Sequence, residues 1–318
     1  MPLRSLLAPR RSSPFPLSML YRALVLLAGT AGTAQAQSLD DAIFMDKRVL
    51  CAGLVYTREQ WTDYWEGTLK RDNGNIGTVT TQQAAFMTAY GVTGRLNVIA
   101  SLPYVSTRAS QGVLQGQSGS QDLSVGVKYN ALSTPLTSAG TLNVIGVASF
   151  SVPTSDYTAD FYPMSIGSRS KRATGRALLS FQAHNGIYVN ASGAYTRRGN
   201  VTLERPAYYT DGQLFLSNEV QMPDVRDMML TVGYQRRGLV VPVTFTQQRT
   251  LGGGDIRRQD MPFVSNRMNF SRLDARVQYT LPRLPGVVLH AGGSRILDGR
   301  NVGQSTTAMV GLLLAGKL

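Results

Sequence analysis

The stretch at residues 272–281, RLDARVQYTL, alternates strictly between polar and apolar side chains. Its even-numbered positions are polar or charged, and its odd-numbered positions are apolar. Because successive side chains of a β-strand point to opposite faces, this period of two predicts a strand with one apolar face and one polar face. Segments of the same design recur in hairpins along nearly the whole chain. The stretch is therefore one arm of a repeated architecture.

The alternating segments predict about twelve strands, with short turns and longer polar loops between them in alternation. The turn His184-Asn185-Gly186 contains Asn-Gly, the dipeptide most typical of a tight hairpin. An even strand count with both chain ends on one side is typical of a bacterial outer-membrane barrel. The expected strands cover residues 49–65, 79–92, 96–105, 122–131, 142–152, 176–183, 187–198, 227–234, 239–248, 272–281, 287–296 and 306–315.

We therefore predict an all-β fold, a transmembrane antiparallel up-and-down β-barrel with its apolar face in lipid. Each unpaired backbone polar group is costly in hydrocarbon, so a sheet that spans a bilayer must close on itself. No apolar run approaches the roughly 18 residues of a membrane helix, which excludes a helical membrane protein. Pro242 removes a ladder donor from the middle of one expected strand, so we expect a bulge or bend there.

The chain of 318 residues is basic, with a formal net charge of +13. The arginines before residue 37 stand in a segment without acids or lysines; excluding them leaves 28 basic and 19 acidic residues, a net charge of +9. These basic residues are spread over loops and turns and do not cluster on one element. Nucleic acid is therefore not an expected partner.

The N-terminus predicts export. Arg22 precedes a short apolar run, and Ala34-Gln35-Ala36 fits the cleavage pattern of a secretory signal. We expect residues 1–36 to be a cleaved signal peptide and residues 37–318 to form the barrel. A start at Met19 would give a signal of ordinary length, and both starts stay open. Residues 38–47 are expected to be a short lead-in, too short for a folded plug. The single cysteine, Cys51, cannot form an internal disulfide and is expected to be a small strand side chain.

Aromatic residues on the apolar face fall near both ends of the strands. A spacing of about eight residues between an apolar face residue at one strand end and the aromatic at the other corresponds to roughly 20 Å for tilted strands, which suits the roughly 25 Å apolar band of such barrels. Two aromatic girdles are therefore expected. The inner one comprises Tyr90, Tyr129, Tyr234 and Tyr279, and the outer one comprises Tyr104, Phe150, Tyr195 and Phe245.

Two neighbouring segments resemble a known family. The sequence TGRLNVIASLPYV at 93–105, followed by GSQDLSVGVKY at 119–129, is similar to the phenol meta-pathway (phenol degradation) outer-membrane proteins. The sequence match covers about residues 90–150. Gly94 departs from the commoner Asp, and the chain ends without the terminal aromatic often seen in barrels. The resemblance implies a transporter for small, often aromatic or hydrophobic, molecules.

Three hypotheses about function stay open. In the first, the barrel is a channel that passes small solutes and is surrounded by outer-membrane lipid. Its lumen is then more basic than acidic, which predicts a weak anion preference. In the second, a filled lumen makes the barrel structural or adhesive. Strand count does not decide between them, and neither does it fix the oligomeric state. The residues expected to line the lumen are Asn97, Asp122, Lys128, Asn190, Arg198, Arg272, Asp274, Arg276, Gln278 and His290.

The third hypothesis is a lipid hydrolase on the barrel wall. Such an enzyme needs a serine and histidine pair with an orienting polar residue. The chain has only His184, in a tight turn, and His290, which shares a strand face with Ser294. No nucleophile motif accompanies them, and the glycines at 252–254 lack the lysine and the helix of a phosphate loop. We therefore expect no catalytic site, no metal and no cofactor.

Overall fold

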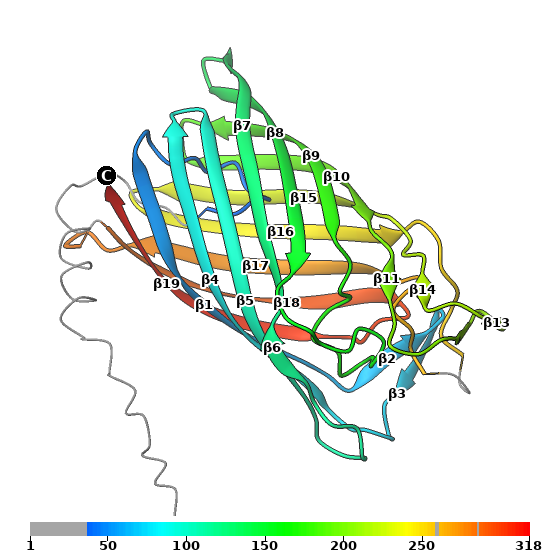
Figure 1. Cartoon of the computed structure of the whole chain (residues 1–318). Coiled ribbons are helices and arrows are strands. Elements are labelled where there is room, and N and C mark those ends of the chain that lie inside the picture. The colour runs from blue at the N-terminus through cyan, green and yellow to red at the C-terminus, as the bar shows by residue number, and fades with distance from the viewer. Residues whose placement is uncertain (1–36, 258–260, 285) are drawn as a thin grey trace, which may run out of the picture.

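The computed structural model describes residues 37–257, 261–284 and 286–318 (Figure 1). The predicted signal peptide at 1–36 lies outside these residues. The chain forms a closed antiparallel barrel, because β1 pairs with β4 on one side and with the last strand, β19, on the other. The barrel strands are β1 (Val49–Trp61), β4 (Val79–Thr93), β5 (Leu96–Ala109), β7 (Asp122–Thr137), β8 (Gly140–Pro153), β9 (Arg172–Ala183), β10 (Ile187–Arg198), β15 (Val225–Arg236), β16 (Leu239–Thr250), β17 (Asn269–Thr280), β18 (Val287–Arg300) and β19 (Thr306–Lys317). The predicted barrel of about twelve strands is confirmed.

The alternation in sequence becomes an inside and an outside. On β1, Leu54 and Tyr56 are 60% and 43% exposed, whereas Val55 between them is 8% exposed. On β17, Val277 is 40% exposed and Gln278 is 5% exposed. A wide band of exposed apolar side chains on a closed sheet is stable only in lipid, because in water it would be a large unpaired hydrophobic surface.

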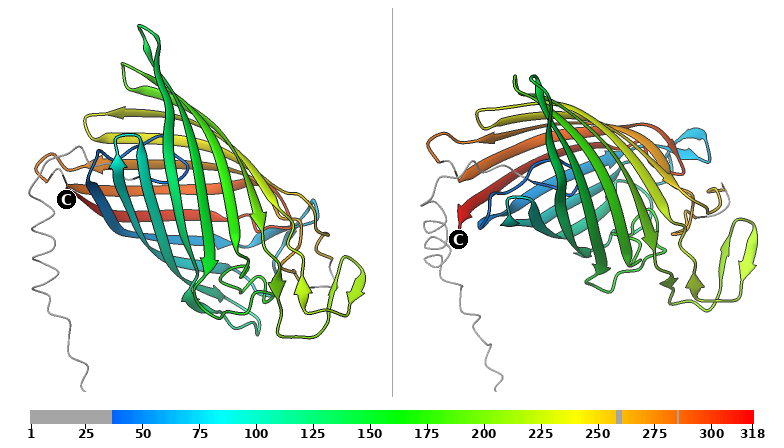
Figure 2. Two further views of the ribbon diagram at one scale, coloured as in Figure 1. Left: turned by 45° about the horizontal axis from the view of Figure 1, so that its top comes forward. Right: turned by 90° about the horizontal axis from the view of Figure 1, so that it is seen from above.

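The two ends of the barrel differ. Short turns and both ends of the described chain lie at one end, and the long loops gather at the other (Figures 1 and 2). We call these the inner and the outer end. The loops carry short strands: β2 (Asp63–Glu66), β3 (Leu69–Asp72), β6 (Ser118–Ser120), β11 (Val201–Thr202), β12 (Tyr208–Thr210), β13 (Gln213–Phe215) and β14 (Glu219–Val220). Among the described residues, no helix is long and apolar enough to cross a bilayer.

Two details of the strands differ from expectation. The first barrel strand ends at Trp61 and not at residue 65, because Asp63–Glu66 leaves the barrel and pairs with Leu69–Asp72 in a loop hairpin. At Pro242 there is no bulge. The pairs Val240↔Gln278 and Val243↔Ala275 keep one register on either side of it, and the ladder to β17 is interrupted between them. The lost donor is therefore tolerated without a shift of the strand.

Candidate functional site

The lumen contains the first described residues of the chain. Residues 37–48, which we call the inner segment, precede β1 and contact inward-facing side chains of β5, β7, β8 and β9. In Figure 1 this blue segment runs between the front and back walls of the barrel. As expected, the segment is a short lead-in without helix or strand before β1. Its position inside the lumen is a finding of the structure.

Lys128 on β7 holds the inner segment by its charge. Its side chain is fully buried, and its Nζ lies 2.9 Å from Oδ1 of Asp41. The same ammonium donates to the backbone carbonyls of Ser38 at 2.9 Å and Asp41 at 3.2 Å, and it lies 5.0 Å from the ring centroid of Phe44. A buried ammonium is stable only when it is paired and hydrogen-bonded, so the barrel wall depends on the segment at this point.

A second ionic contact lies on β9. The guanidinium of Arg176 is 2.8 Å from Asp227 on β15 and 3.2 Å from Asp40 of the inner segment. Asp227 belongs to the wall and Asp40 to the segment, so Arg176 links the two. At the start of the segment, the side-chain amide of Gln37 lies 2.9 Å from that of the buried Asn97.

Apolar packing also holds the segment against the barrel wall. Leu39, Ala42 and Phe44 pack against a buried cluster on β8 and β9, formed by Ile145, Val147 and Leu178. Met45 belongs to a second cluster, which also contains Cys51, Ile99 and Val288. Cys51 is thus a small buried side chain, as predicted.

Inward-facing glycines make room for the segment. A Cβ added to Gly126 would lie 2.6 Å from Cδ2 of Leu39, and one added to Gly91 would collide with the carbonyl of Asp46. Protein interiors leave few voids, so a larger residue at either position would displace the segment. The wall is therefore shaped for the segment that it holds.

At the outer end, the loop at 154–171 folds over the lumen. The hydroxyl of Thr107, on the inner face of β5, donates to the carbonyl of Met164 at 2.6 Å. Asp122 accepts from the Tyr157 hydroxyl at 2.9 Å and from Arg172 at 2.8 Å. The loops at 154–171, 199–224 and 251–268 share a further buried cluster, made of Ala159, Val201, Leu203, Tyr208, Val220, Met222, Phe263 and Val264. The outer mouth is thus covered by packed loops.

Two ionisable side chains in the outer loops, Tyr157 and Asp255, have shifted pKa values. Burial, together with the charge of Asp122, raises the pKa of Tyr157, which therefore stays a hydrogen-bond donor at neutral pH. Hydrogen bonds from Arg300, with a contribution from Asn301, lower the pKa of Asp255 to about 2. Arg300 lies at the end of β18 and contacts Asp255 through Nε at 2.7 Å and Nη2 at 2.5 Å. This bidentate pair fixes the loop at 251–257 to the barrel.

The wall on the other side of the lumen is polar and less completely filled. Asn190 Oδ1, Gln278 Oε1 and His290 Nε2 are buried, and none has a hydrogen-bond partner among the described residues. A cavity of about 20 Å³ lies between this wall and the inner segment, with Asp40, Asn190, Arg276 and Gln278 in its lining. A cavity of this size holds a water molecule. This side of the lumen therefore has room for a water molecule beside the segment.

The structure places all ten predicted lumen residues on the face opposite the exposed apolar band. Lys128 and Asn97 bind the inner segment, Asp122 binds the outer loop, and Arg272 pairs with Asp274 at 3.0 Å. Arg276 has no carboxylate within ion-pair distance in the described part of the chain. A role in transport stays a prediction for the whole set, Asn97, Asp122, Lys128, Asn190, Arg198, Arg272, Asp274, Arg276, Gln278 and His290.

The predicted girdle residues lie on the outer face. Tyr90 is partly buried, and the other members are between 38% and 54% exposed. Their position relative to a bilayer stays a prediction. The set is Tyr90, Tyr104, Tyr129, Phe150, Tyr195, Tyr234, Phe245 and Tyr279.

Sequence reasoning missed four residues that the lumen brings together. Asp40 and Asp41 stand in a lead-in without periodicity, and Arg176 and Asp227 lie at strand ends. One signal was available, since an acidic pair precedes a barrel whose inward face is basic. Nothing in the order of residues says that the chain turns back into the lumen, however.

The fold is similar to known outer-membrane barrels. The structure of an outer membrane channel from Pseudomonas putida F1 matches with a TM-score of 0.69 at 12% identity, over 89% of this chain and 99% of that chain. The translocator domain of the autotransporter NalP from Neisseria meningitidis matches with a TM-score of 0.44 at 11% identity, over 95% and 96% of the two chains. The NanC porin matches with a TM-score of 0.43 at 11% identity, over 83% and 100%.

No family model matches the chain. No curated protein matches it either. The Pseudomonas putida channel shares the fold, and the closed barrel with its exposed apolar band decides the location in a membrane. The chain is a bacterial outer-membrane β-barrel. The resemblance to phenol meta-pathway proteins stays a prediction that rests on residues 90–150.

The hydrolase hypothesis gains no geometric support. His290 Nε2 has no partner among the described residues, and no hydrogen bond there joins His290 to Ser294. A serine nucleophile with a histidine base is therefore not assembled on this wall.

Proposed function

We propose that this barrel is an outer-membrane channel for small molecules, and that the inner segment closes it in the conformation described here. The polar wall carries the proposal. Asn190, Gln278 and His290 have buried polar atoms that have no partner among the described residues and would need water as a partner. In a permanently sealed and dry interior, such atoms would destabilise the fold. The cavity of about 20 Å³ lined by Asn190 and Gln278 has room for a water molecule only, so conduction of solutes would require the segment to move.

In this proposal the segment leaves the lumen. It belongs to no strand, and two ionic contacts, Lys128 with Asp41 and Arg176 with Asp40, hold it together with hydrogen bonds and apolar packing. Its departure would remove Asp40 and Asp41 from the lumen while the basic side chains of the wall stay. The open lumen would be more positive than the closed one, so we propose a preference for anions, including aromatic carboxylates, that appears on opening.

The test compares the unmodified protein with the double variant Asp40→Asn/Asp41→Asn in planar bilayers and in liposome-swelling assays. We expect low conductance for the unmodified protein. The variant should show a conductance at least several-fold higher, with uptake of small sugars and aromatic acids. Asp72→Asn, which makes the same chemical change at an exposed position in an outer loop, is the control and should conduct like the unmodified protein.

A structural barrel with a permanently filled lumen is the second candidate, and the complete burial of Lys128 against the segment favours it. The same experiment separates the two. A folded double variant that neither conducts nor swells liposomes would support the structural function and contradict the channel.

A further inference from the structure

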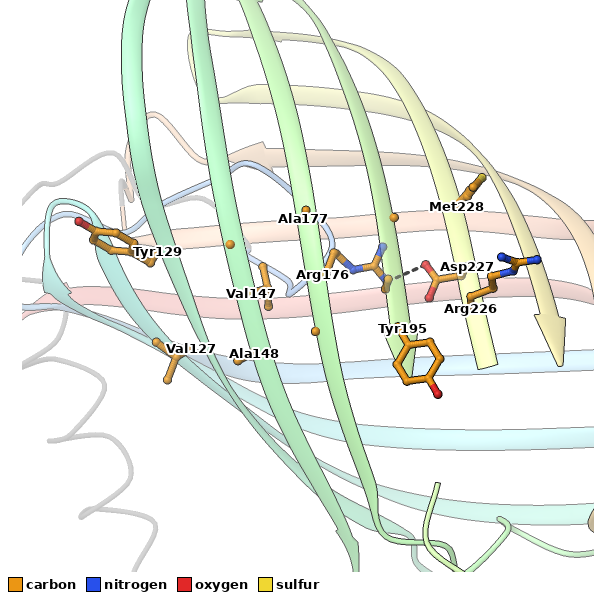
Figure 3. Close-up of a pocket in the computed structure, with 14 residues that line it drawn as sticks. Val127, Tyr129, Val147, Ala148, Arg176, Ala177, Tyr195, Arg226, Asp227 and Met228 are labelled. Carbon is orange, nitrogen blue, oxygen red and sulfur yellow. Dashed lines mark ion pairs between the residues drawn. The ribbon is translucent and has the colours of Figure 1, made fainter. Parts of the chain in front are cut away.

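A broad groove crosses the lipid-facing side of the barrel over strands β7 to β15, with a volume of about 810 Å³ (Figure 3). Its floor is made of outward-facing small residues on three neighbouring strands: Gly146, Ala148, Gly175, Ala177 and Gly193. An added Cβ would meet nothing within 4 Å at Gly146 or Gly175. The groove therefore exists because these positions lack side chains, and not because the strands separate there.

The strand register turns these small residues into two continuous rows. One row pairs Tyr129 with Gly146, Gly146 with Ala177, and Ala177 with Gly193. The neighbouring row pairs Ala148 with Gly175 and continues through Tyr195 to Arg226. Four strand spacings give the groove a length of roughly 19 Å. Since the strands of such barrels tilt by about 40°, the rows run obliquely across the apolar band.

The two ends of the groove lie at residues of opposite predicted girdles. Tyr129 at one end belongs to the predicted inner girdle, and Tyr195 at the other end belongs to the outer girdle. Both are about half exposed, at 48% and 50%. The groove is thus an apolar channel on the hydrocarbon-facing wall that ends at the level where outer-leaflet headgroups begin.

Two arginines stand at that outer end. Arg226 on β15 and Arg249 on β16 are exposed on the outer face and directly opposite each other in the antiparallel ladder. Directly opposed residues have Cα atoms roughly 5 Å apart, and like charges in this position are destabilising. Neither guanidinium makes an ion pair with any carboxylate in the described part of the chain.

The neighbouring carboxylate does not neutralise the pair. Asp224 accepts hydrogen bonds from the Tyr195 hydroxyl and the Arg198 backbone N–H, and it makes no ion pair with Arg226 or Arg249 among the described residues. Two opposed guanidinium groups without a carboxylate repel each other. An anion bound between them would reduce this electrostatic repulsion. Guanidinium groups bind phosphate through paired N–H donors, and the apolar groove that ends at Arg226 fits an acyl chain, so the two features together fit a phosphorylated lipid.

We propose that this face of the barrel binds one phosphorylated lipid of the outer leaflet, with a phosphate between Arg226 and Arg249 and an acyl chain in the groove. Figure 3 shows Arg226 beside Tyr195 and Met228 at the end of the groove. The phosphate relieves the repulsion between the arginines. The acyl chain covers Gly175 and its neighbours, where the wall offers no side chain of its own to the hydrocarbon.

The test measures equilibrium binding of bisphosphorylated lipid A to the full chain refolded in detergent micelles, beside the same lipid without its phosphates. The unmodified protein should bind the phosphorylated form roughly tenfold more tightly, the factor expected when charge-assisted hydrogen bonds are lost. Arg226→Gln/Arg249→Gln should abolish this difference and leave binding of the dephosphorylated lipid unchanged.

Filling the groove separates its contribution from that of the charges. Gly146→Leu/Gly175→Leu should weaken the binding of both lipids and leave the binding of inorganic phosphate unchanged. The added side chains enter open space on the outer face, so they fill the groove without disturbing the barrel. The matched control is Arg58→Gln/Arg108→Gln, which removes two exposed, outward-facing arginines away from the groove.

Three results would overturn the proposal. Equal binding of the two lipids by the unmodified protein would show that there is no phosphate site. An equal loss of binding in the Arg58→Gln/Arg108→Gln control would show that the effect comes from the overall charge of the protein. Unchanged lipid binding by the groove-filled variant would remove the acyl site. Far-ultraviolet circular dichroism of every variant establishes that the barrel is folded.

Discussion

The Nζ of Lys128 lies 2.9 Å from Oδ1 of Asp41, and this pair is one of two ionic contacts that join the barrel wall to the segment in the lumen. Lys128 is fully buried, whereas the Asp41 side chain keeps 15% of its surface exposed. The wall therefore carries the more strongly desolvated charge. When the segment leaves, that charge must be rehydrated in the lumen, so the closed and open states differ chiefly in what surrounds Lys128.

A double-mutant cycle on this pair tests the coupling. Asp41→Asn leaves the buried ammonium of Lys128 without its carboxylate, which destabilises the closed state by roughly 3–5 kcal/mol. This variant should therefore have a higher open fraction than the unmodified protein. Lys128→Met/Asp41→Asn replaces both charges and should be more closed than Asp41→Asn alone. Single-channel recordings give the open fraction of each. Equal open fractions for the single and the double variant would show that the pair does not hold the segment.

Gly126→Leu should open the lumen by a steric route. The new side chain would occupy the place of Leu39, whose Cδ2 lies 2.6 Å from the position of an added Cβ. Gly146→Leu on the neighbouring strand is the matched control, because its side chain points into open space outside the barrel. Higher conductance of Gly126→Leu alone is the expected result of liposome swelling. Identical behaviour of the two variants would contradict the seat that we assign to Leu39.

Selectivity should depend more on Arg276 than on Arg272. Arg272 is paired with Asp274, whereas Arg276 lies beside the lumen cavity without a carboxylate partner in the described residues. In the open background of Asp40→Asn/Asp41→Asn, Arg276→Gln should shift the reversal potential toward lower anion preference, and Arg272→Gln should shift it less. Arg108→Gln, on the outer face, serves as the control. A cation-selective open channel would refute the proposed selectivity.

The lipid-facing surface has its own test. Val277 is 40% exposed in the middle of β17, and an arginine there should cost roughly 2–4 kcal/mol of barrel stability. Thr306 is exposed on the same outer face at the outer end of β19, where an arginine should cost about 0–1 kcal/mol. Urea unfolding in lipid vesicles measures both. Similar costs at the two positions would mean that depth in the membrane has been assigned wrongly.

The loop around Asp255 should loosen in acid. Hydrogen bonds from Arg300 lower the pKa of Asp255 to about 2, below the ordinary value of about 4. The stabilisation is therefore fully present above about pH 4, and it is lost as the pH falls toward 2. Asp255→Asn should show the loose loop already at neutral pH. Hydrogen exchange of residues 251–257, compared between the two proteins at each pH, measures this. A difference that grows on acidification would contradict the sign.

The sequence by itself determined the barrel. A period of two specifies which side chains share a face, and repetition with alternating short and long connections specifies an even, closed sheet. Val277 and Gln278 could be assigned to opposite faces without coordinates, because neighbouring strand residues have no other geometry. The same rule places Asp274 on one face with Arg272 and Arg276, each two residues away, and the structure pairs it with Arg272.

Only the tertiary structure decided what occupies the lumen and what crosses the outer wall. The inner segment has no periodicity, and its position depends on Lys128 and Gly126, which are about ninety residues away in sequence. The groove depends on register, because Gly146, Gly175 and Gly193 become neighbours only when three strands pair in one alignment. Local alternation fixes the face of a residue, whereas contacts between distant segments depend on the free energy of the whole packed chain.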